Sequence, residues 1–486
     1  MKNNRETEGR NKKLSGGLLW ISDRFRKNLS VIAVIIPVII AVWHVYNTKS
    51  WKIPQRVIAW DVISYYSYLP ATFIYHDPTL KFIDEKQPYP EILFWPNKTS
   101  DNRYVIKMSL GLSYLYAPFF FLAHATVGLT DQNPSGFSPH YKYFLVLSGI
   151  FFYLIGLLVL RKILRMYFSE FITAFVILTI ALATNLFYYG STEATMPHVY
   201  LFALINIFIL ITIRWYESPG YLKTILLGIL TGLISLIRPT NLIILFFFLL
   251  WDIRSGKDLK IRFQTLGKYF HHIIIIGILT FIIWIPQFLY WKTSTGHWVF
   301  FSYVGERFYF LHPQILNGLF SFRKGWLLYT PVMIFALAGI PVLWHRRKEF
   351  FWPVIVMLIL HIYLIYSWWC WYYGGSLGSR PMIDIYGPLA VSMAAFLQWT
   401  LEKKKWIRIT LITLFLMAGF KGGLLNIQYY YGTIHWEGMT SRAYFKSLFR
   451  IKYYPEINDL IKIPDHESAK KGVEKYFLNN RIVDNE

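Results

Sequence analysis

Asp61 is the first residue whose type and position suggest chemistry. It follows the first long apolar run and begins the aromatic-rich stretch 61–70 (DVISYYSYLP). A carboxylate there can act as a general base that accepts a proton from a hydroxyl group. Aspartate is also favoured at helix N-termini, so capping of a short helix is the alternative interpretation. The sequence therefore makes Asp61 a candidate catalytic base.

Two arginines are the most informative cations. Arg238 ends the apolar segment 228–237 and precedes Pro239, which breaks a helix. A broken helix at membrane depth usually lines a cavity. Arg380 follows the glycine- and serine-rich turn 374–379, whose backbone N–H groups can hold an anion. A guanidinium binds phosphate through two hydrogen bonds, so both arginines are candidate phosphate ligands. The alternatives are an Arg238 that reaches the lipid headgroups and a turn that only connects two helices.

Other candidates lie in the same loops or at the ends of apolar segments. Three tryptophans beside the glycine-rich turn favour a surface that stacks on a sugar or faces lipid. Further candidate phosphate or donor ligands are Lys107, Arg323 and His198. Candidates for the lining of a substrate groove are Tyr65, Tyr66, Glu193, Trp371, Tyr373 and Asp384. For Lys107, Glu193 and His198, a position at the membrane interface is by itself a sufficient explanation.

The composition predicts an all-α integral membrane protein. The 486 residues are 55% hydrophobic, 19% aromatic and 16% charged, which is too apolar for a string of soluble domains. The formal net charge of +23 arises from Lys and Arg in short loops between apolar runs. Such loops indicate orientation in a membrane, so no nucleic-acid partner is expected.

Apolar runs predict about eleven transmembrane helices, with a range of about nine to thirteen. They lie near 29–46, 141–160, 171–189, 198–213, 222–237, 240–252, 272–290, 331–344, 350–367, 384–400 and 407–425. The basic N-terminus is then cytoplasmic, and the basic loops 161–165, 252–272, 345–348 and 403–405 fall on the same side. This alternation is the pattern expected of a multi-pass protein with a cytoplasmic N-terminus.

The alternation requires that the apolar segment 110–127 lies along the membrane surface and does not cross it. The first external loop is then 47–140, long enough for interfacial helices anchored by Tyr and Trp. The predicted organisation is a cytoplasmic basic N-terminus (1–28), a transmembrane domain (29–425) and an external C-terminal tail (426–486). No cleavage pattern follows the first apolar run, which we expect to be a retained anchor.

Metal and nucleotide sites have little support in the sequence. The single cysteine, Cys370, excludes an internal disulfide framework and a cysteine-ligated metal cluster. His271 and His272 are adjacent, and neighbouring positions on a helix point away from each other. The turn 374–379 lacks the lysine and the strand-to-helix setting of a phosphate-binding loop. No metal-binding residues are therefore predicted.

The motifs resemble a known group of enzymes. The early acidic loop residue Asp61, the amphipathic segment after it, the LIRPTN helix break (236–241) and the GGSLGSRP loop (374–381) are similar to those of bacterial polytopic glycosyltransferases of the GT-C fold. This group contains protein O-mannosyltransferases and the lipid A aminoarabinose transferase. The resemblance covers the layout of 29–425 but only a few short motifs.

The resemblance implies a polyprenyl-phosphate-linked sugar donor and transfer on the outer side of the bacterial inner membrane, with inversion at the anomeric carbon. The acidic residue of the first external loop is the usual catalytic position, which corresponds to Asp61. Many relatives carry an acidic pair there, whereas Val62 follows Asp61 in this chain. A metal-assisted mechanism is therefore in doubt, although a divalent cation stays open as a cofactor.

The expected reaction needs a base and a stabilised leaving group. Asp61 would accept the proton of the acceptor hydroxyl, and the arginines would stabilise the departing lipid phosphate. The acceptor stays open as a glycan, a lipid or a protein. Alternatives are a transporter or flippase of lipid-linked glycans, and a glycan ligase or polymerase. Charges concentrated at one face, with a single clear helix break, argue against transport.

Overall fold

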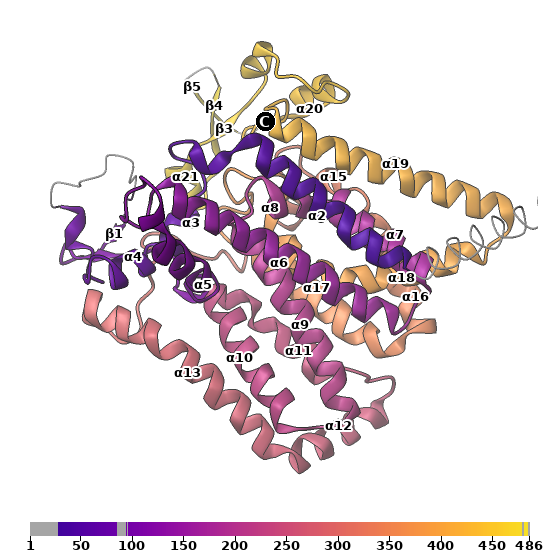
Figure 1. Ribbon diagram of the computed structural model, residues 1–486. Coiled ribbons are helices and arrows are strands. Elements are labelled where there is room, and N and C mark those ends of the chain that lie inside the picture. Colours follow the sequence, from indigo (N-terminus) through magenta and orange to yellow (C-terminus); the bar gives the residue numbers. More distant parts are fainter. Residues whose placement is uncertain (1–27, 85–93, 95, 479–480, 485–486) are drawn as a thin grey trace, which may run out of the picture.

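The protein is built mainly from α-helices, and each predicted apolar segment contains one (Figure 1). A computed structural model describes residues 28–84, 94, 96–478 and 481–484. Within these residues, seven helices are long and apolar enough to cross a membrane. They are α2 (Leu29–Thr48), α5 (Gly111–Thr126, continued by η3, Val127–Leu129), α6 (Pro139–Arg165), α9 (Pro197–Glu217), α13 (Phe270–Thr295), α17 (Lys348–Tyr366) and α19 (Lys405–Tyr430).

Shorter helices complete the bundle. Those that overlap predicted apolar segments are α7 (Glu170–Leu182), α8 (Leu186–Ser191), α10 (Tyr221–Ile237), η4 (Pro239–Ile243), α11 (Ile244–Leu250), α16 (Met333–Arg346), η5 (Arg380–Ile385) and α18 (Tyr386–Leu401). Those in the connections are η1 (Ser50–Lys52), α3 (Asp61–Tyr66), α4 (Tyr68–Phe73), η2 (Lys81–Ile83), α12 (Gly256–Lys268), α14 (Ile315–Phe320), α15 (Trp326–Tyr329), α20 (Ser441–Ser447), η6 (Pro455–Asp459) and α21 (His466–Lys470).

Two small antiparallel sheets add to the helices, and the all-α expectation does not include them. Strand β1 (Asn97–Lys98) pairs with β2 (Tyr104–Val105) in the first long loop. In the C-terminal segment the strand order is β3 (Ile463–Pro464), β4 (Lys475–Leu478) and β5 (Arg481–Asp484). The predicted cytoplasmic segment 1–28 lies outside the described residues except for Asn28.

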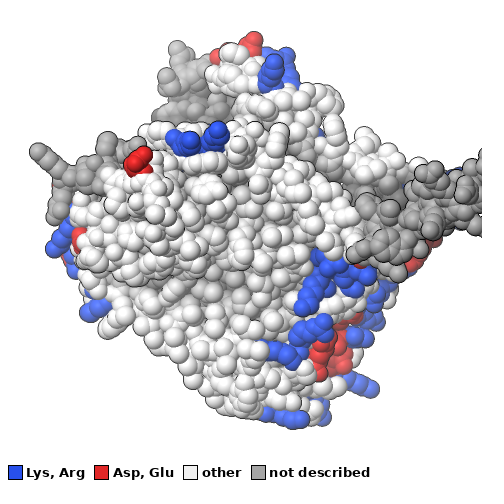
Figure 2. Space-filling view, in the orientation of Figure 1, with Lys and Arg blue, Asp and Glu red and all other residues white. Residues whose placement is uncertain are grey.

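The surface of the bundle is apolar. Side chains such as Phe281 (60% exposed) on α13 and Phe420 (70% exposed) on α19 point outward. Figure 2 shows a broad band without Lys, Arg, Asp or Glu, with charged side chains grouped above it, at its left edge and along its lower right margin. Exposure of so much apolar area is costly in water and favourable in lipid. The chain is therefore a multi-pass membrane protein.

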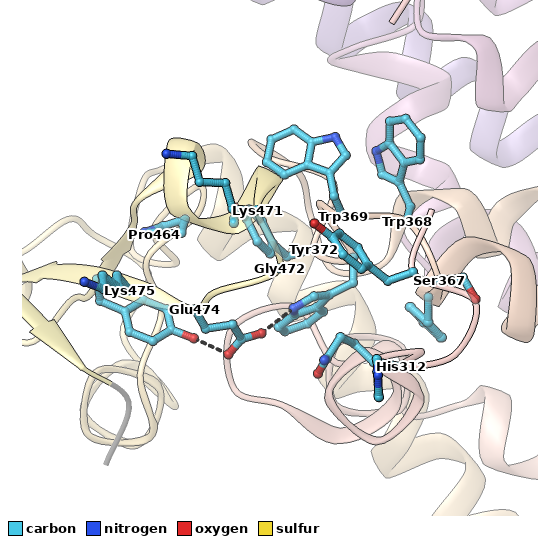
Figure 3. A pocket seen from close by; sticks show the side chains of 16 residues that line it. His312, Ser367, Trp368, Trp369, Tyr372, Pro464, Lys471, Gly472, Glu474 and Lys475 are labelled. Atoms are coloured by element: carbon cyan, nitrogen blue, oxygen red, sulfur yellow. Dashed lines mark hydrogen bonds between the residues drawn. The ribbon is translucent and has the colours of Figure 1, made fainter. Parts of the chain in front are cut away.

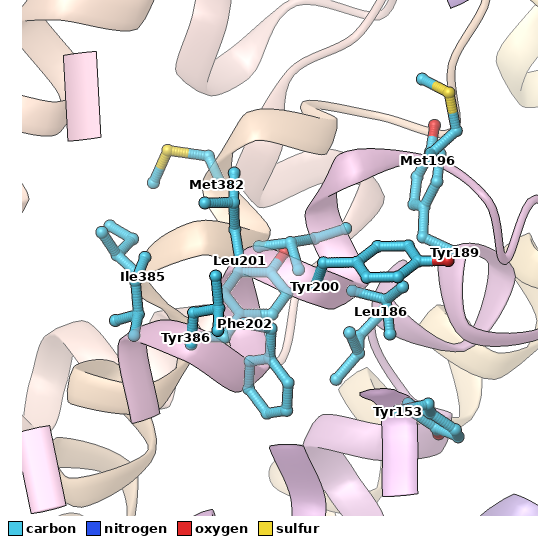
Figure 4. Packing of buried hydrophobic residues seen from close by; sticks show 14 of the residues in the cluster. Tyr153, Leu186, Tyr189, Met196, Tyr200, Leu201, Phe202, Met382, Ile385 and Tyr386 are labelled. Carbon is cyan, nitrogen blue, oxygen red and sulfur yellow. The ribbon is translucent and has the colours of Figure 1, made fainter. Parts of the chain in front are cut away.

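Close helix packing depends on small residues. Gly228 and Gly232 on α10 face α13, and a methyl group added at Gly232 would lie 2.7 Å from Cβ of Ile283. This spacing is the small-xxx-small pattern that lets membrane helices approach closely. A second packed region surrounds α9, where Tyr200 contacts Phe152 of α6 and Phe202 packs against Gly156 of the same helix (Figure 4).

Salt bridges and hydrogen bonds tie the loops at one end of the bundle together. Ser30 at the start of α2 donates its backbone N–H to Oε1 of Glu170 at 2.8 Å. Arg165 at the end of α6 pairs with Glu170 at 2.6 Å, and Arg347 donates to the Tyr167 carbonyl at 2.8 Å. The predicted basic loops 161–165 and 345–348 thus meet at this end, which we call the basic end.

Helix α5 lies across the opposite end of the bundle. Before its start, the Ser109 hydroxyl donates to the carbonyl of Leu236, at the C-terminus of α10. In its last turn, Oγ1 of Thr126 lies 2.8 Å from Nε2 of His140, at the N-terminus of α6. These ends of α10 and α6 are the ones remote from the basic end. Both ends of α5 therefore contact helix ends remote from the basic end, and α5 is also long and apolar enough to span a membrane.

Candidate active site

Asp61 and Arg380 form an ion pair at the end of the bundle opposite the basic end. Asp61 is the first residue of α3, and its Oδ2 accepts a hydrogen bond from Nη2 of Arg380 at 2.7 Å. Their side chains are 34% and 14% exposed, so the pair is reachable from outside. The N-cap position belongs to Trp60, which has a left-handed φ of 52° and carries no capping hydrogen bond. The interpretation of Asp61 as an N-cap is therefore not supported, and strained backbone precedes it.

The surroundings of Asp61 keep it ionised. Burial alone would raise the pKa of its carboxyl group, but the charges of Arg380 and Lys107 and the hydrogen bond from Arg380 outweigh this and hold it below the usual value. At neutral pH Asp61 is a carboxylate, as a general base must be. The lowered pKa also makes it a weaker base for as long as Arg380 stays bound.

Arg238 is held by a buried carboxylate. Its Nη1 lies 3.3 Å from Oδ2 of Asp384, whose side chain is fully buried. The same oxygen accepts from the Asn241 amide at 2.8 Å, and Oδ1 lies 3.3 Å from Nδ1 of His198. Pro239 ends α10 at this point, so the helix break brings Arg238 and Asn241 together on Asp384. Within the described residues Arg238 forms no other side-chain hydrogen bond, which leaves donors for an anion.

Lys107 enters from the first long loop. Its Nζ lies 2.5 Å from Oε1 of Glu306 and 5.3 Å from the centre of the Tyr303 ring. Glu306 also accepts from Nε1 of Trp369 at 3.0 Å. Lys107 and its partner thus connect the neighbourhood of Asp61 to the tryptophan-rich segment before the glycine-rich turn. We refer to Asp61, Arg380, Arg238, Asp384 and Lys107 as the charged cluster.

Tyrosines and a second acid surround the charged cluster. Burial raises the pKa of the Tyr65 phenol, on which the charges of Arg238 and Asp61 also act. The Tyr373 ring centre lies 5.7 Å from the Arg238 guanidinium. Burial also raises the pKa of Glu193, against the opposing charge of Arg380. Tyr65, Tyr373, Glu193 and His198 therefore join the charged cluster in one neighbourhood, whereas the sequence presented them as separate candidates.

Three predicted residues lie apart from this neighbourhood. The Tyr66 hydroxyl donates to the Gly136 carbonyl at 2.5 Å and its ring packs in the core, since adjacent helical residues point about 100° apart. Arg323 lies over the Tyr476 ring at 4.4 Å, and Trp371 donates to Glu474 at 2.9 Å. No described contact joins these three residues to the Asp61–Arg380 pair, and their predicted roles stay predictions.

Several contributing residues were not singled out from the sequence. Asn241 is the last residue of the LIRPTN stretch, but an asparagine after a proline indicates only a turn. Tyr303 and Glu306 lie in the connection before α14, where no periodic pattern marks them. His361 lies inside the apolar helix α17, and its Nε2 is 2.9 Å from the Pro381 carbonyl. For His361 the sequence does contain a signal, because a histidine in an apolar span usually has a polar partner.

The arrangement suits an anion. Among the described residues, no group of three or more His, Cys, Asp or Glu side chains could hold a metal. Two guanidinium groups and an ammonium group stand near a single accessible carboxylate instead. Such a set can neutralise a phosphate while the carboxylate accepts a proton.

A cavity of about 190 Å³ lies between the tryptophan-rich segment and the C-terminal tail (Figure 3). Trp368, Trp369 and Tyr372 form one side of the cavity. Lys471 and Glu474 of the tail form the other. The site thus has two neighbouring parts, one charged and one aromatic.

Comparison with known proteins does not assign the chain to a family. No protein-family model and no curated protein matches it. Among solved structures it is similar to the archaeal oligosaccharyltransferase AglB from Archaeoglobus fulgidus in complex with an inhibitory peptide and a dolichol-phosphate. The identity is 14% and the TM-score 0.46, over 84% of this chain and 56% of that one.

The apo form of the Archaeoglobus fulgidus oligosaccharyltransferase is similar at 13% identity and a TM-score of 0.48, over 90% of this chain and 58% of that one. The chain therefore spans little more than half the length of these two structures. Similarities this weak carry no argument about activity, so the function has to be argued from the residues of the chain itself.

Proposed function

We propose that the protein is a membrane glycosyltransferase that moves a sugar from a polyprenyl-phosphate donor to an acceptor hydroxyl. The observation that supports this most is the charged cluster, in which one accessible carboxylate, Asp61, lies beside the cations Arg380, Arg238 and Lys107. A sugar phosphate needs both parts: a base for the attacking hydroxyl and positive charge for the leaving phosphate.

The proposal includes an orientation of the protein in the membrane. The basic end faces the cytoplasm, eleven helices cross the bilayer, and α5 lies along the outer surface of a bacterial inner membrane. The charged cluster is then extracytoplasmic, at the level where the lipid phosphate lies. Trp60, which is 84% exposed beside Asp61, anchors this region at the interface. The polyprenyl chain enters from the lipid while its phosphate reaches the arginines.

The ion pair between Asp61 and Arg380 suggests how donor binding prepares the base. When the donor phosphate arrives, Arg380 shifts from Asp61 to the phosphate, and Asp61 becomes a stronger base. The acceptor oxygen then attacks the anomeric carbon and its proton passes to Asp61. The bond between that carbon and the phosphate oxygen breaks, polyprenyl phosphate leaves, and the configuration inverts. Arg238, held by Asp384, stabilises the charge of the leaving group.

Donor turnover with a matched pair of arginine variants tests the proposal. Sugar release from a radiolabelled polyprenyl-phosphate donor is measured with purified protein in detergent. Arg238→Ala should lower kcat/KM by about 10²–10³-fold, which is typical for the loss of one electrostatic stabiliser. Arg103→Ala is the control, because Arg103 is 44% exposed on the same loop as Lys107 and its only acidic partner within the described residues is the exposed Asp101.

Two results would contradict the proposal. Equal losses in Arg238→Ala and Arg103→Ala would remove Arg238 from phosphate binding. No sugar release by the parent protein across a broad panel of donors would favour the alternatives, which are transport of a lipid-linked glycan and ligation of preformed glycans.

A further inference from the structure

The cavity between the tryptophan-rich segment and the C-terminal tail has no part in the reaction described so far. Its volume of about 190 Å³ is many times the roughly 10–15 Å³ that a buried water requires. It is bounded by segments 309–314, 366–372 and 464–476, which the fold brings together from two loops and the tail (Figure 3). A site assembled from three distant segments can hold a specific ligand.

The lining combines flat aromatic surfaces with polar groups. Trp368, Trp369 and Tyr372 present rings on one side of the cavity, and Tyr309 and Tyr476 add two more. Polar side chains of the lining, besides the tyrosines and tryptophans, are those of His312, Gln314, Ser367, Lys471, Glu474 and Lys475. A sugar ring has an apolar C–H face and a rim of hydroxyls, and it matches such a lining. Its face stacks on a Trp or Tyr ring while its hydroxyls reach the donors and acceptors.

The lining is already held in place. Glu474 accepts from Nε1 of Trp371 at 2.9 Å and from the Tyr476 hydroxyl at 2.6 Å. The Arg323 guanidinium stands 5.3 Å from the Tyr372 ring centre and 4.4 Å from that of Tyr476. These contacts order the aromatic rings before any ligand binds, which lowers the entropy lost on binding.

A short chain of contacts links the cavity to the charged cluster. Trp369 lines the cavity, and its Nε1 donates to Oε2 of Glu306 at 3.0 Å. The other oxygen of Glu306 pairs with Lys107 at 2.5 Å, and the charge of Lys107 acts on the Asp61 carboxyl group. A ligand in the cavity is therefore connected, through Trp369, Glu306 and Lys107, to the group that we propose as the base.

We infer that the cavity binds a sugar unit of the acceptor, and that the acceptor is a glycan. This inference rests on the proposed function. With one acceptor sugar held against Trp369, a hydroxyl of the neighbouring unit attacks the anomeric carbon of the donor, its proton passes to Asp61, and polyprenyl phosphate leaves. A peptide acceptor fits less well, because an extended peptide is recognised through backbone hydrogen bonds along a sheet edge or groove. The lining of this cavity consists largely of side chains.

Saturation-transfer NMR tests the inference on the full-length protein in a detergent without a sugar headgroup. The probes are methyl glycosides of glucose, mannose, galactose and N-acetylglucosamine, with unstructured peptides of similar mass as a second panel. Trp369→Ala removes the stacking face, and Trp369→Phe keeps an aromatic ring but loses the N–H. Trp298→Ala is the matched control, since Trp298 is 57% exposed and does not line the cavity. Cleavage of the donor by water, which needs no acceptor, is measured on the same preparations.

We expect at least one glycoside to bind the parent protein and Trp298→Ala equally well. Trp369→Ala should weaken that binding by about tenfold or more, and Trp369→Phe by less than about threefold. Absence of glycoside binding, equal binding by Trp369→Ala, or binding of peptides alone would overturn the inference. If the protein still cleaves the donor when one of these results is found, the inference of an acceptor-sugar site fails but the proposed function stands. Glycoside binding that depends on Trp369 in a protein unable to cleave any donor would support the sugar site and contradict the proposed function.

Discussion

At the level of single residues, Arg380 has two partners. It pairs with Asp61 in the structure and with the donor phosphate in the proposed reaction. The bond to Asp61, 2.7 Å long, explains how a partly accessible carboxylate keeps a pKa below its usual value. A base locked in an ion pair would be a poor catalyst. In the proposed reaction, the exchange of Arg380 from carboxylate to phosphate would make proton acceptance depend on a bound donor.

The acidic limb of the pH–rate profile should report this pairing. Asp61 must be ionised to act, so the rate falls as the pH drops through its pKa. Arg380→Gln removes the positive charge and the hydrogen bond that lower this pKa, so the pKa rises and the limb moves to higher pH. Lys107→Gln should move it in the same direction by less, because the charge of Lys107 has the smaller influence.

The measurement is kcat/KM for donor cleavage against pH, with each variant scaled to its own maximum. An acidic limb at the same pH in the parent and in Arg380→Gln would show that the limb does not report Asp61. A larger movement in Lys107→Gln than in Arg380→Gln would contradict the pairing seen in the structure.

At the level of secondary-structure elements, close packing of two helices depends on the positions of small residues. Gly232→Leu should separate α10 from α13, because even a Cβ at that position would lie 2.7 Å from Cβ of Ile283. Overpacking of this kind typically costs about 1–3 kcal/mol. Gly277→Leu on α13 is the matched control, since a Cβ there meets nothing within 4 Å.

Thermal unfolding in detergent, followed by intrinsic fluorescence, measures both variants. Gly232→Leu should melt several degrees below the parent, and Gly277→Leu should melt close to it. Because α10 leads directly into Arg238, Gly232→Leu should also lower donor turnover. Equal melting temperatures for the two variants would contradict close packing of α10 on α13.

The elements were easier to predict from the sequence than their contacts. Long apolar runs and basic loops mark helices through composition alone, and each predicted segment contains one. Asp61, Arg238 and Arg380 were also recognisable, because each stands beside a local signal: an aromatic loop, a helix break or a glycine-rich turn. The partners of these residues were not recognisable, because Asp61 and Arg380 are 319 positions apart and no local sequence pattern indicates a contact over that separation.

For the whole molecule, the main question is its membrane topology, and in particular whether α5 crosses the membrane. If α5 lies on the outer surface, the stretch 130–136 after it is on the same side as Asp101. If α5 crosses, that stretch is on the other side. The protein has one cysteine, Cys370, which is buried, so a cysteine-free Cys370→Ser background is available for labelling. The exposed positions Asp101, Gln132 and Lys257 serve as reporters.

In intact cells, a membrane-impermeant maleimide should label Asp101→Cys and Gln132→Cys but should not label Lys257→Cys. Permeabilised cells should allow labelling of all three, which confirms that each site is reactive. Labelling of Asp101→Cys without Gln132→Cys in intact cells would show that α5 crosses the membrane. The predicted orientation of every later helix would then be reversed.

Sugar release from a radiolabelled polyprenyl-phosphate donor, compared between the parent and Asp61→Asn, tests the central claim most directly. Asn keeps the shape of the side chain but cannot accept the proton, so turnover should fall by about 10²–10⁴-fold. Asp101→Asn, an exposed aspartate on the same loop, should retain full turnover. Both variants should elute as folded monodisperse protein. Undiminished turnover by a folded Asp61→Asn variant would remove Asp61 from the role of base and contradict the mechanism built around it.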